Sequence, residues 1–122
     1  MKHEFYIPTK IFFGRGCLDK LGEIKLPGKK AMIITTSDQW IVEAGHLRRL
    51  EGLLKKGGAE SVFYNGVHPN PGKKQVEEAA RICREEGCDM VLGFGGGSSI
   101  DTAKSIALLA VNEGDFWDYV AT

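Results

Sequence analysis

The stretch from residue 89 to residue 104 constrains this chain more than any other, because it joins a short apolar run to three consecutive glycines and a polar-led segment. The apolar run predicts a buried strand, Gly95–Gly97 predict a turn, and residues 98–112 predict a helix. Such a turn presents unpaired backbone N–H groups to an anion, and glycine lacks the Cβ that would keep a phosphate away. The spacing matches neither G-x-x-x-x-G-K-[ST] nor G-x-G-x-x-G, so it predicts a phosphate site without naming the ligand.

The rest of the chain alternates between strand and helix patterns. Continuous apolar runs predict strands, and apolar residues spaced three and four apart predict helices between them. In chain order these are a strand over 30–36, a helix over 45–56, a strand over 60–64 and a helix opened by Asn70-Pro71. With residues 89–112, this order predicts an α/β fold with a doubly wound, mainly parallel, Rossmann-like sheet.

The N-terminal segment is aromatic and β-branched. Residues 4–8 and 10–14 predict a short β-hairpin at a sheet edge, where Pro8 is tolerated. A chain of 122 residues, 43% of them hydrophobic, suits one globular domain.

Composition argues against several classes of function. Sixteen basic and sixteen acidic residues balance, so no nucleic acid or anionic membrane is expected as a partner. No apolar run approaches membrane-spanning length and the N-terminus lacks a signal-peptide core, so we expect a soluble, cytoplasmic protein. Cys17, Cys83 and Cys88 are predicted to be reduced thiols, and the three histidines have no metal-ligand spacing, so no metal site is expected in this stretch.

Residues 95–104, Gly-Gly-Gly-Ser-Ser-Ile-Asp-Thr-Ala-Lys, resemble the G-G-G-S-x-x-D-x-x-K signature of the iron-containing (group III) alcohol dehydrogenases. The opening segment 6–14, the strand 30–36 and the connection 69–71 agree with the same family in order. The resemblance covers the whole chain. It implies that residues 1–122 are the NAD(P)-binding α/β domain of a two-domain enzyme, and that the helical metal-binding domain is absent from this chain. We therefore expect a fragment that is inactive alone.

The resemblance also implies a reaction. The full-length enzyme would move a hydride between NAD or NADP and a small primary alcohol or aldehyde, with a divalent metal, iron or zinc, polarising the substrate oxygen. That metal is expected only in the full-length enzyme. The oligomeric state is left open, with a homodimer as one possibility. Two alternatives remain, a lyase of the dehydroquinate-synthase type and a stand-alone phosphate- or nucleotide-binding module.

The predicted contacts to the cofactor pyrophosphate are Gly95, Gly96, Gly97 and Ser98. Ser98 also fits a helix N-cap, a role compatible with phosphate contact. Asp101 has two readings of equal weight: the resemblance implies a catalytic place facing the nicotinamide, whereas the spacing from Ser98 fits a capping box.

Thr36 and Asp38 are the predicted contacts to the cofactor ribose. Thr36 ends a predicted strand, and ligands of such sheets bind at the carboxyl ends of strands. Many family members have an aspartate at this position, which would exclude a 2′-phosphate by charge. The neutral hydroxyl of Thr36 weakens the case for strict NAD selectivity. Asp38 could take the place of the family aspartate if the loop is shifted.

Overall fold

The sheet and its helices form one alternating α/β unit in the computed structural model, which describes residues 2–4, 8–36, 44–67 and 72–112. The strands β1 (Lys30–Thr36), β2 (Glu60–Val67) and β3 (Met90–Gly93) form a parallel sheet in the order β2-β1-β3. The helices are η1 (Cys17–Gly22), α2 (His46–Lys56), α3 (Lys73–Glu85) and α4 (Gly97–Val111), and η1 is a short 3-10 helix. The predicted alternation and the parallel sheet are therefore confirmed.

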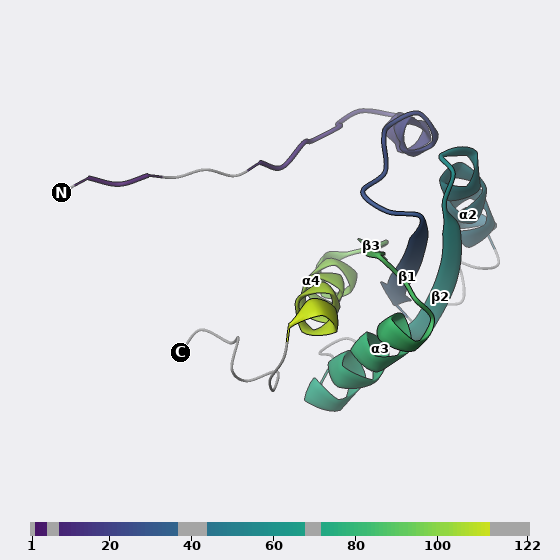
Figure 1. Ribbon diagram of the computed structural model, residues 1–122. Helices are drawn as coiled ribbons and strands as arrows, with labels where there is room; N and C mark the ends of the chain where they lie inside the picture. Colours follow the sequence, from purple (N-terminus) through teal and green to yellow (C-terminus); the bar gives the residue numbers. More distant parts are fainter. Residues whose placement is uncertain (1, 5–7, 37–43, 68–71, 113–122) are drawn as a thin grey trace.

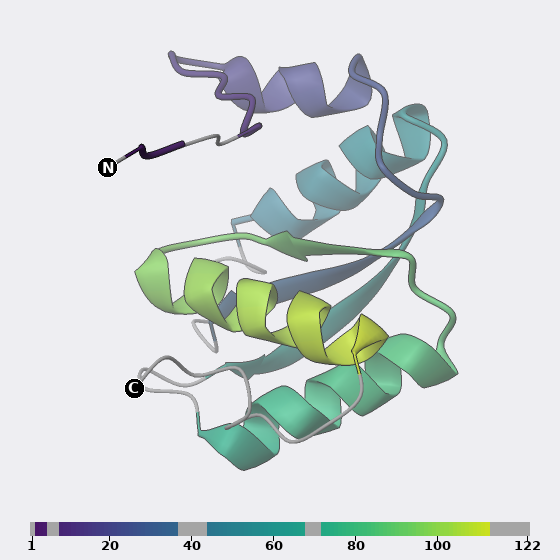
Figure 2. The same ribbon diagram turned by 60° about the vertical axis from the view of Figure 1, so that its left-hand side comes forward.

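Strand β1 is the centre of the fold because both of its faces are covered. Ala31 and Ile33 pack against α2, while Met32 and Ile34 pack on the other face against α3 and α4, and all four side chains are fully buried. Figure 2 shows α3 and α4 side by side on one face of the sheet and α2 on the other. A strand buried on both faces must be apolar at every position, which explains the continuous run in its sequence.

Pairing between β1 and β3 fixes where the chain leaves the sheet. Ile34 lies opposite Gly93, and the N–H of Phe94 donates to the carbonyl of Ile34 at 2.8 Å. The glycine turn that follows β3 therefore begins beside the carboxyl end of β1, as expected for a ligand site in a parallel sheet.

A carboxylate joins the amino ends of the same two strands. Asp89, just before β3, accepts the N–H of Lys29 at 2.9 Å and the N–H of Lys30 at 2.8 Å, across about sixty residues of sequence. These backbone hydrogen bonds lower the pKa of the Asp89 carboxyl. The contact is close, because a side chain at Gly28 would overlap this carboxylate.

The expected N-terminal hairpin is not found in the described residues. Residues 2–4 and 8–13 contain no strand, and residues 5–7 lie outside the described part of the chain. Figure 1 shows the N-terminal segment running away from the sheet, with Ile11 and Phe13 80% and 99% exposed. A two-stranded hairpin is marginal without a third strand or a helix beneath it, and the large apolar side chains of residues 11–13 are exposed. The prediction is wrong for these residues.

The start of α3 also differs from its prediction. The helix begins at Lys73 with Gly72 in the N-cap position and no capping side chain. The predicted cap, Asn70-Pro71, lies outside the described residues.

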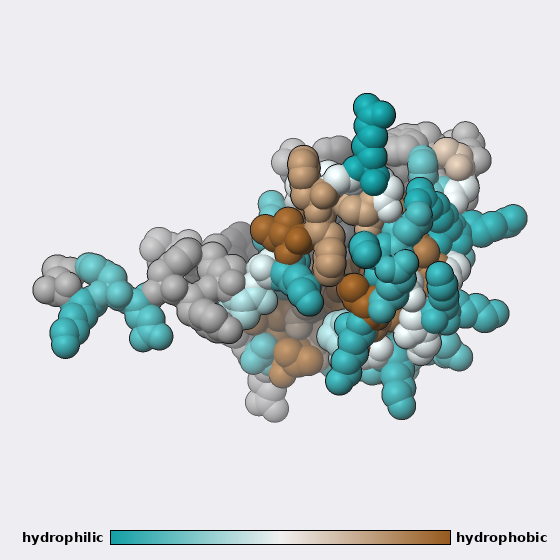
Figure 3. Space-filling view, turned by 90° about the horizontal axis from the view of Figure 1, so that it is seen from above, coloured by the Kyte–Doolittle hydropathy of each residue, from teal (hydrophilic) through white to brown (hydrophobic). Residues whose placement is uncertain are grey.

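On the face seen from above, apolar groups gather left of the centre, and long hydrophilic side chains cover most of the right-hand part (Figure 3). None of the helices in the described ranges has the length and apolar character needed to cross a membrane.

Candidate functional site

The glycine turn connects the end of β3 to the start of α4, and its first glycine is required by the fold. Gly95 has φ +136°, a conformation that side chains rarely adopt. A Cβ built on Gly95 would also lie 2.9 Å from the Oγ of Ser99. Gly95 is therefore explained by the turn itself.

The next two glycines have no such explanation. Gly96 is extended, with φ −81° and ψ −169°, and a Cβ on either Gly96 or Gly97 would meet no atom of the described residues within 4 Å. Both residues are exposed. Their missing side chains leave open space in front of the helix, as a close backbone approach to a phosphate requires.

The N-terminus of α4 is uncapped. Gly96 is its N-cap residue, no side chain of the described residues caps the first turn, and that turn contains no acidic residue. The N–H groups of the first turn and the positive end of the helix dipole therefore face the open space beside the glycines.

The predicted capping roles are wrong. Ser98 is the second residue of α4, and its carbonyl accepts a hydrogen bond from the Thr102 hydroxyl at 2.6 Å. An N-cap needs a non-helical backbone, which here belongs to Gly96. Asp101 lies five residues beyond Gly96 and is too far along the helix to close a capping box.

Two hydroxyl groups that the sequence did not single out lie beneath the turn. Thr35 is 1% exposed and Ser99 is fully buried, and neither hydroxyl has a hydrogen-bond partner among the described residues. Sequence spacing could not have found them, because their burial depends on where α4 crosses the sheet.

Close packing holds α4 over the carboxyl edge of the sheet. A Cβ on Gly93, the last residue of β3, would lie 3.0 Å from the Cβ of Ala103 and 3.1 Å from the Cα of Ile100. A side chain at Gly93 would require these neighbours to shift by a few tenths of an ångström, so glycine lets α4 pack this closely on β3.

The predicted ribose and catalytic residues are only partly located. Thr36 is the last residue of β1, next to the strand that leads into the glycine turn, so the structure brings these two segments to one edge. Asp38 lies outside the described residues. Asp101 is exposed on α4, just beyond its first turn.

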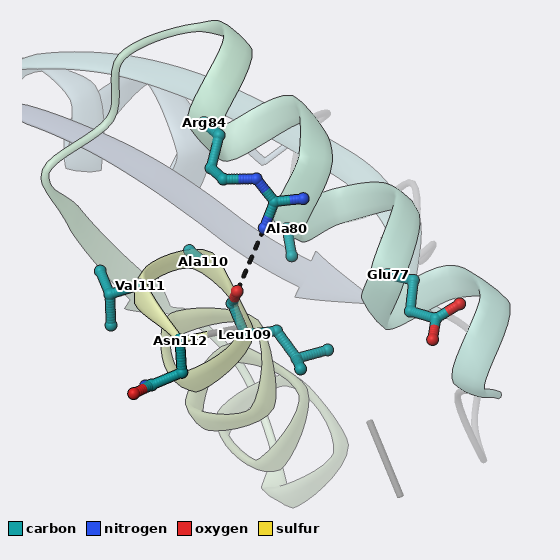
Figure 4. Close-up of a pocket in the computed structure, with 7 residues that line it drawn as sticks. All are labelled: Glu77, Ala80, Arg84, Leu109, Ala110, Val111 and Asn112. Carbon is teal, nitrogen blue, oxygen red and sulfur yellow. Dashed lines mark hydrogen bonds between the residues drawn. The ribbon is translucent and has the colours of Figure 1, made fainter. Parts of the chain in front are cut away.

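A hollow of about 540 Å³ lies between α3 and the end of α4 (Figure 4). Arg84 lines this hollow, and its guanidinium donates to the Leu109 carbonyl at 3.1 Å. This hydrogen bond satisfies a carbonyl near the C-terminus of α4. Leu109 lies twelve residues after Gly97, about 18 Å along the helix. The hollow is therefore separate from the glycine turn.

The two neighbouring thiols are structural. Cys88 N–H donates to the Cys83 carbonyl at 3.0 Å where Gly87, with φ +70°, ends α3, an arrangement that brings the two side chains together. Burial, followed by the neighbouring Cys83, raises the pKa of Cys88 to about 11, and burial also raises the pKa of Cys83. Neither thiol is a ready nucleophile near neutral pH.

Among the residues that the structure describes, no three His, Cys, Asp or Glu side chains are placed to hold a metal ion. The described residues therefore do not fit the divalent metal that the family resemblance implies.

Comparison with known proteins identifies the family. The model of the family described as iron-containing alcohol dehydrogenase matches residues 8–122. The chain belongs to this family. It is 40% identical to alcohol dehydrogenase 4 of Schizosaccharomyces pombe, over 94% of this chain and 27% of that protein. It is 39% identical to NADH-dependent butanol dehydrogenase A of Clostridium acetobutylicum, over 98% of this chain and 31% of that protein.

The solved structures of iron-containing alcohol dehydrogenases agree with the fold. NADH-dependent butanol dehydrogenase A of Thermotoga maritima superposes with a TM-score of 0.81 at 39% identity, over 96% of this chain and 30% of that one. The chain thus spans about a third or less of the length of these relatives.

Proposed function

We propose that this chain is the dinucleotide-binding part of an NAD(P)-dependent, metal-containing alcohol dehydrogenase. The complete enzyme transfers a hydride between the nicotinamide and a primary alcohol or its aldehyde. In this proposal residues 1–122 form one NAD(P)-binding domain, and the glycine turn with Ser98 binds the cofactor pyrophosphate.

The open space beside Gly96 and Gly97 carries the proposal. Neither position needs glycine for its backbone or its packing, and both face an uncapped helix N-terminus. A phosphate placed there accepts hydrogen bonds from backbone N–H groups without meeting a side chain. Family membership and the name of the NADH-dependent butanol dehydrogenase support a nicotinamide dinucleotide as the ligand. The family also favours an oxidoreductase over the lyase alternative.

Each part of the cofactor has a proposed contact. Thr36 and Asp38 are the proposed contacts to the ribose, and a neutral residue at position 36 would not repel a 2′-phosphate. Asp101 is the proposed residue at the nicotinamide end. The divalent metal supplies Lewis-acid chemistry in the complete enzyme, and its ligands would have to come from outside the described residues.

The direct test is a titration of this chain with NADH and with NADPH, followed by calorimetry and repeated on Gly96→Val. A Cβ at Gly96 would meet no described atom within 4 Å, so the variant should fold and lose binding. Blocking two charge-assisted hydrogen bonds of about 1.5 kcal/mol each should weaken affinity about 100-fold.

Gly72→Val is the matched control, because Gly72 is also an uncapped helix N-cap in extended conformation, with φ −85° and open space beside it. It should bind like the wild type. Equal affinity of Gly96→Val and wild type would refute the pyrophosphate assignment. If the wild type binds neither dinucleotide, the same titration on a chain extended to the length of its relatives distinguishes an incomplete cleft from a purely structural turn.

A second assay tests whether this chain alone can carry out the metal-dependent reaction. With iron or zinc added, this chain alone should not reduce NAD or NADP in the presence of a primary alcohol. Activity would place the metal site among these 122 residues and overturn the assignment.

A further inference from the structure

The two unpaired hydroxyls beneath the glycine turn face the same residue. A Cβ built on Gly95 would lie 2.9 Å from the Oγ of Ser99 and 3.8 Å from the Oγ1 of Thr35. Both residues are buried, and neither hydroxyl has a partner in the described part of the chain. The end of β1 and the first turn of α4 thus bring two unsatisfied polar groups to one point.

The same helix shows how such a hydroxyl is normally satisfied. Thr102 is 2% exposed, and its hydroxyl donates to the carbonyl four residues earlier, that of Ser98, at 2.6 Å. The residue four before Ser99 is Gly95, which lies outside the helix with φ +136°. Ser99 therefore lacks the bond that Thr102 makes.

The strand end is irregular at the corresponding place. Ile34 pairs with Tyr64, but Thr36 pairs with Val67, so β2 has an extra residue opposite Thr35. Irregularities of this kind redirect a strand and are common beside functional sites. An unsatisfied buried hydroxyl destabilises a fold, and two of them beside one glycine call for an explanation.

We propose that Thr35 and Ser99 are positioning residues of the anion site, and that their hydroxyls gain hydrogen-bond partners when a diphosphate occupies the glycine turn. The proposal rests on the function proposed above. Glycine changes its backbone angles at low cost, so a ligand held by the N–H groups of the turn can rotate the Gly95 peptide toward the two hydroxyls. Because both side chains are buried, they act on the ligand through Gly95 and do not touch it.

This arrangement links binding to stability with opposite signs. Removing an unsatisfied hydroxyl stabilises the ligand-free protein, whereas in the ligand-bound protein the same substitution removes a hydrogen bond and weakens ligand binding. A merely structural hydroxyl would lower stability when removed and would leave ligand affinity unchanged.

The experiment compares Thr35→Val, Ser99→Ala and the double variant with wild type, by thermal unfolding and by calorimetric titration with inorganic pyrophosphate and NADH. Each single variant should unfold at the same or a higher temperature and bind both probes about fivefold more weakly, the value of one neutral hydrogen bond. The double variant should lose less than the product of the single losses, because both hydroxyls act through Gly95. Thr102→Val, which removes a satisfied hydroxyl, should unfold at a lower temperature with unchanged affinity.

Three outcomes overturn the proposal. Wild-type affinity in both single variants, while Gly96→Val still fails to bind, would remove the positioning role and leave the proposed function intact. Lower unfolding temperatures in Thr35→Val and Ser99→Ala would mean that the hydroxyls are satisfied in the free protein. If neither this chain nor a chain extended to the length of its relatives binds pyrophosphate or NADH, the proposed function is refuted and this role with it.

Discussion

Gly93 is the position where a single methyl group tests how α4 is held. In Gly93→Ala the new Cβ would lie 3.0 Å from the Cβ of Ala103, 3.1 Å from the Cα of Ile100 and 3.2 Å from the carbonyl oxygen of Ser99. Two of these three atoms belong to the helix backbone, which cannot swing aside as the end of a flexible side chain can. The methyl group must therefore displace α4 from β3.

Overpacking of this kind costs about 2 kcal/mol. For a domain of about this size, such a loss lowers the thermal unfolding midpoint by about 10 °C. Circular dichroism during heating measures the change. Gly52→Ala is the control, because Gly52 lies inside α2 with open space beside it, and alanine there should stabilise the helix by about 1 kcal/mol.

Displacement of α4 also moves the N-terminus that faces the glycine turn. Gly93→Ala should therefore weaken pyrophosphate binding, whereas Gly52→Ala should not. An unfolding midpoint of Gly93→Ala equal to or above that of wild type would show that β3 and α4 are not closely packed.

Three further predictions follow from the strand ends and the thiols. Asp89→Asn should destabilise the protein at pH 7. Hydrogen bonds lower the pKa of the Asp89 carboxyl in the folded protein. The carboxylate therefore stabilises the fold above its ordinary pKa of 3.8, and this stabilisation is lost as the pH falls through the lower folded pKa. Unfolding of both proteins from pH 7 to pH 2 should show the difference narrowing in acid, and a constant difference would contradict this. Thr36→Asp should weaken NADPH binding about tenfold in a titration and spare NADH, because a carboxylate repels the 2′-phosphate; equal losses would argue against contact with the ribose. Cys88, with a pKa of about 11, should react with iodoacetamide at pH 8 about 100-fold more slowly in the folded chain than in urea, as measured by mass spectrometry; equal rates would refute its burial.

The elements that were predicted well are those whose signal is local. The strand predicted over 30–36 matches β1, and the helix predicted over 45–56 begins one residue before α2. Apolar periodicity and glycine breakers are read directly from the chain, so tertiary contacts were not needed. The helix predicted over 98–112 was also correct to within one residue at each end.

The errors fall where a role depends on backbone angles or on distant partners. Ser98 was a plausible cap by residue type, yet the extended backbone that a cap requires belongs to Gly96. The hydrogen bonds from the backbone N–H groups of Lys29 and Lys30 to the Asp89 carboxylate join segments about sixty residues apart, and no spacing rule predicts them. The described part of the predicted N-terminal hairpin contains no strand for a related reason, since the pattern is local but a hairpin needs a surface to pack on.

The order of strands and helices, the glycine turn and the family could all be predicted from the amino-acid sequence, because all three depend on neighbouring residues and short motifs. Only the tertiary structure placed β1 between β2 and β3 and brought Thr35 and Ser99 together beneath Gly95. It also distinguished Gly95, which the fold requires, from Gly96 and Gly97, which it does not. The difference is physical: local patterns determine which element forms, whereas burial and close approach exist only after separate elements have packed.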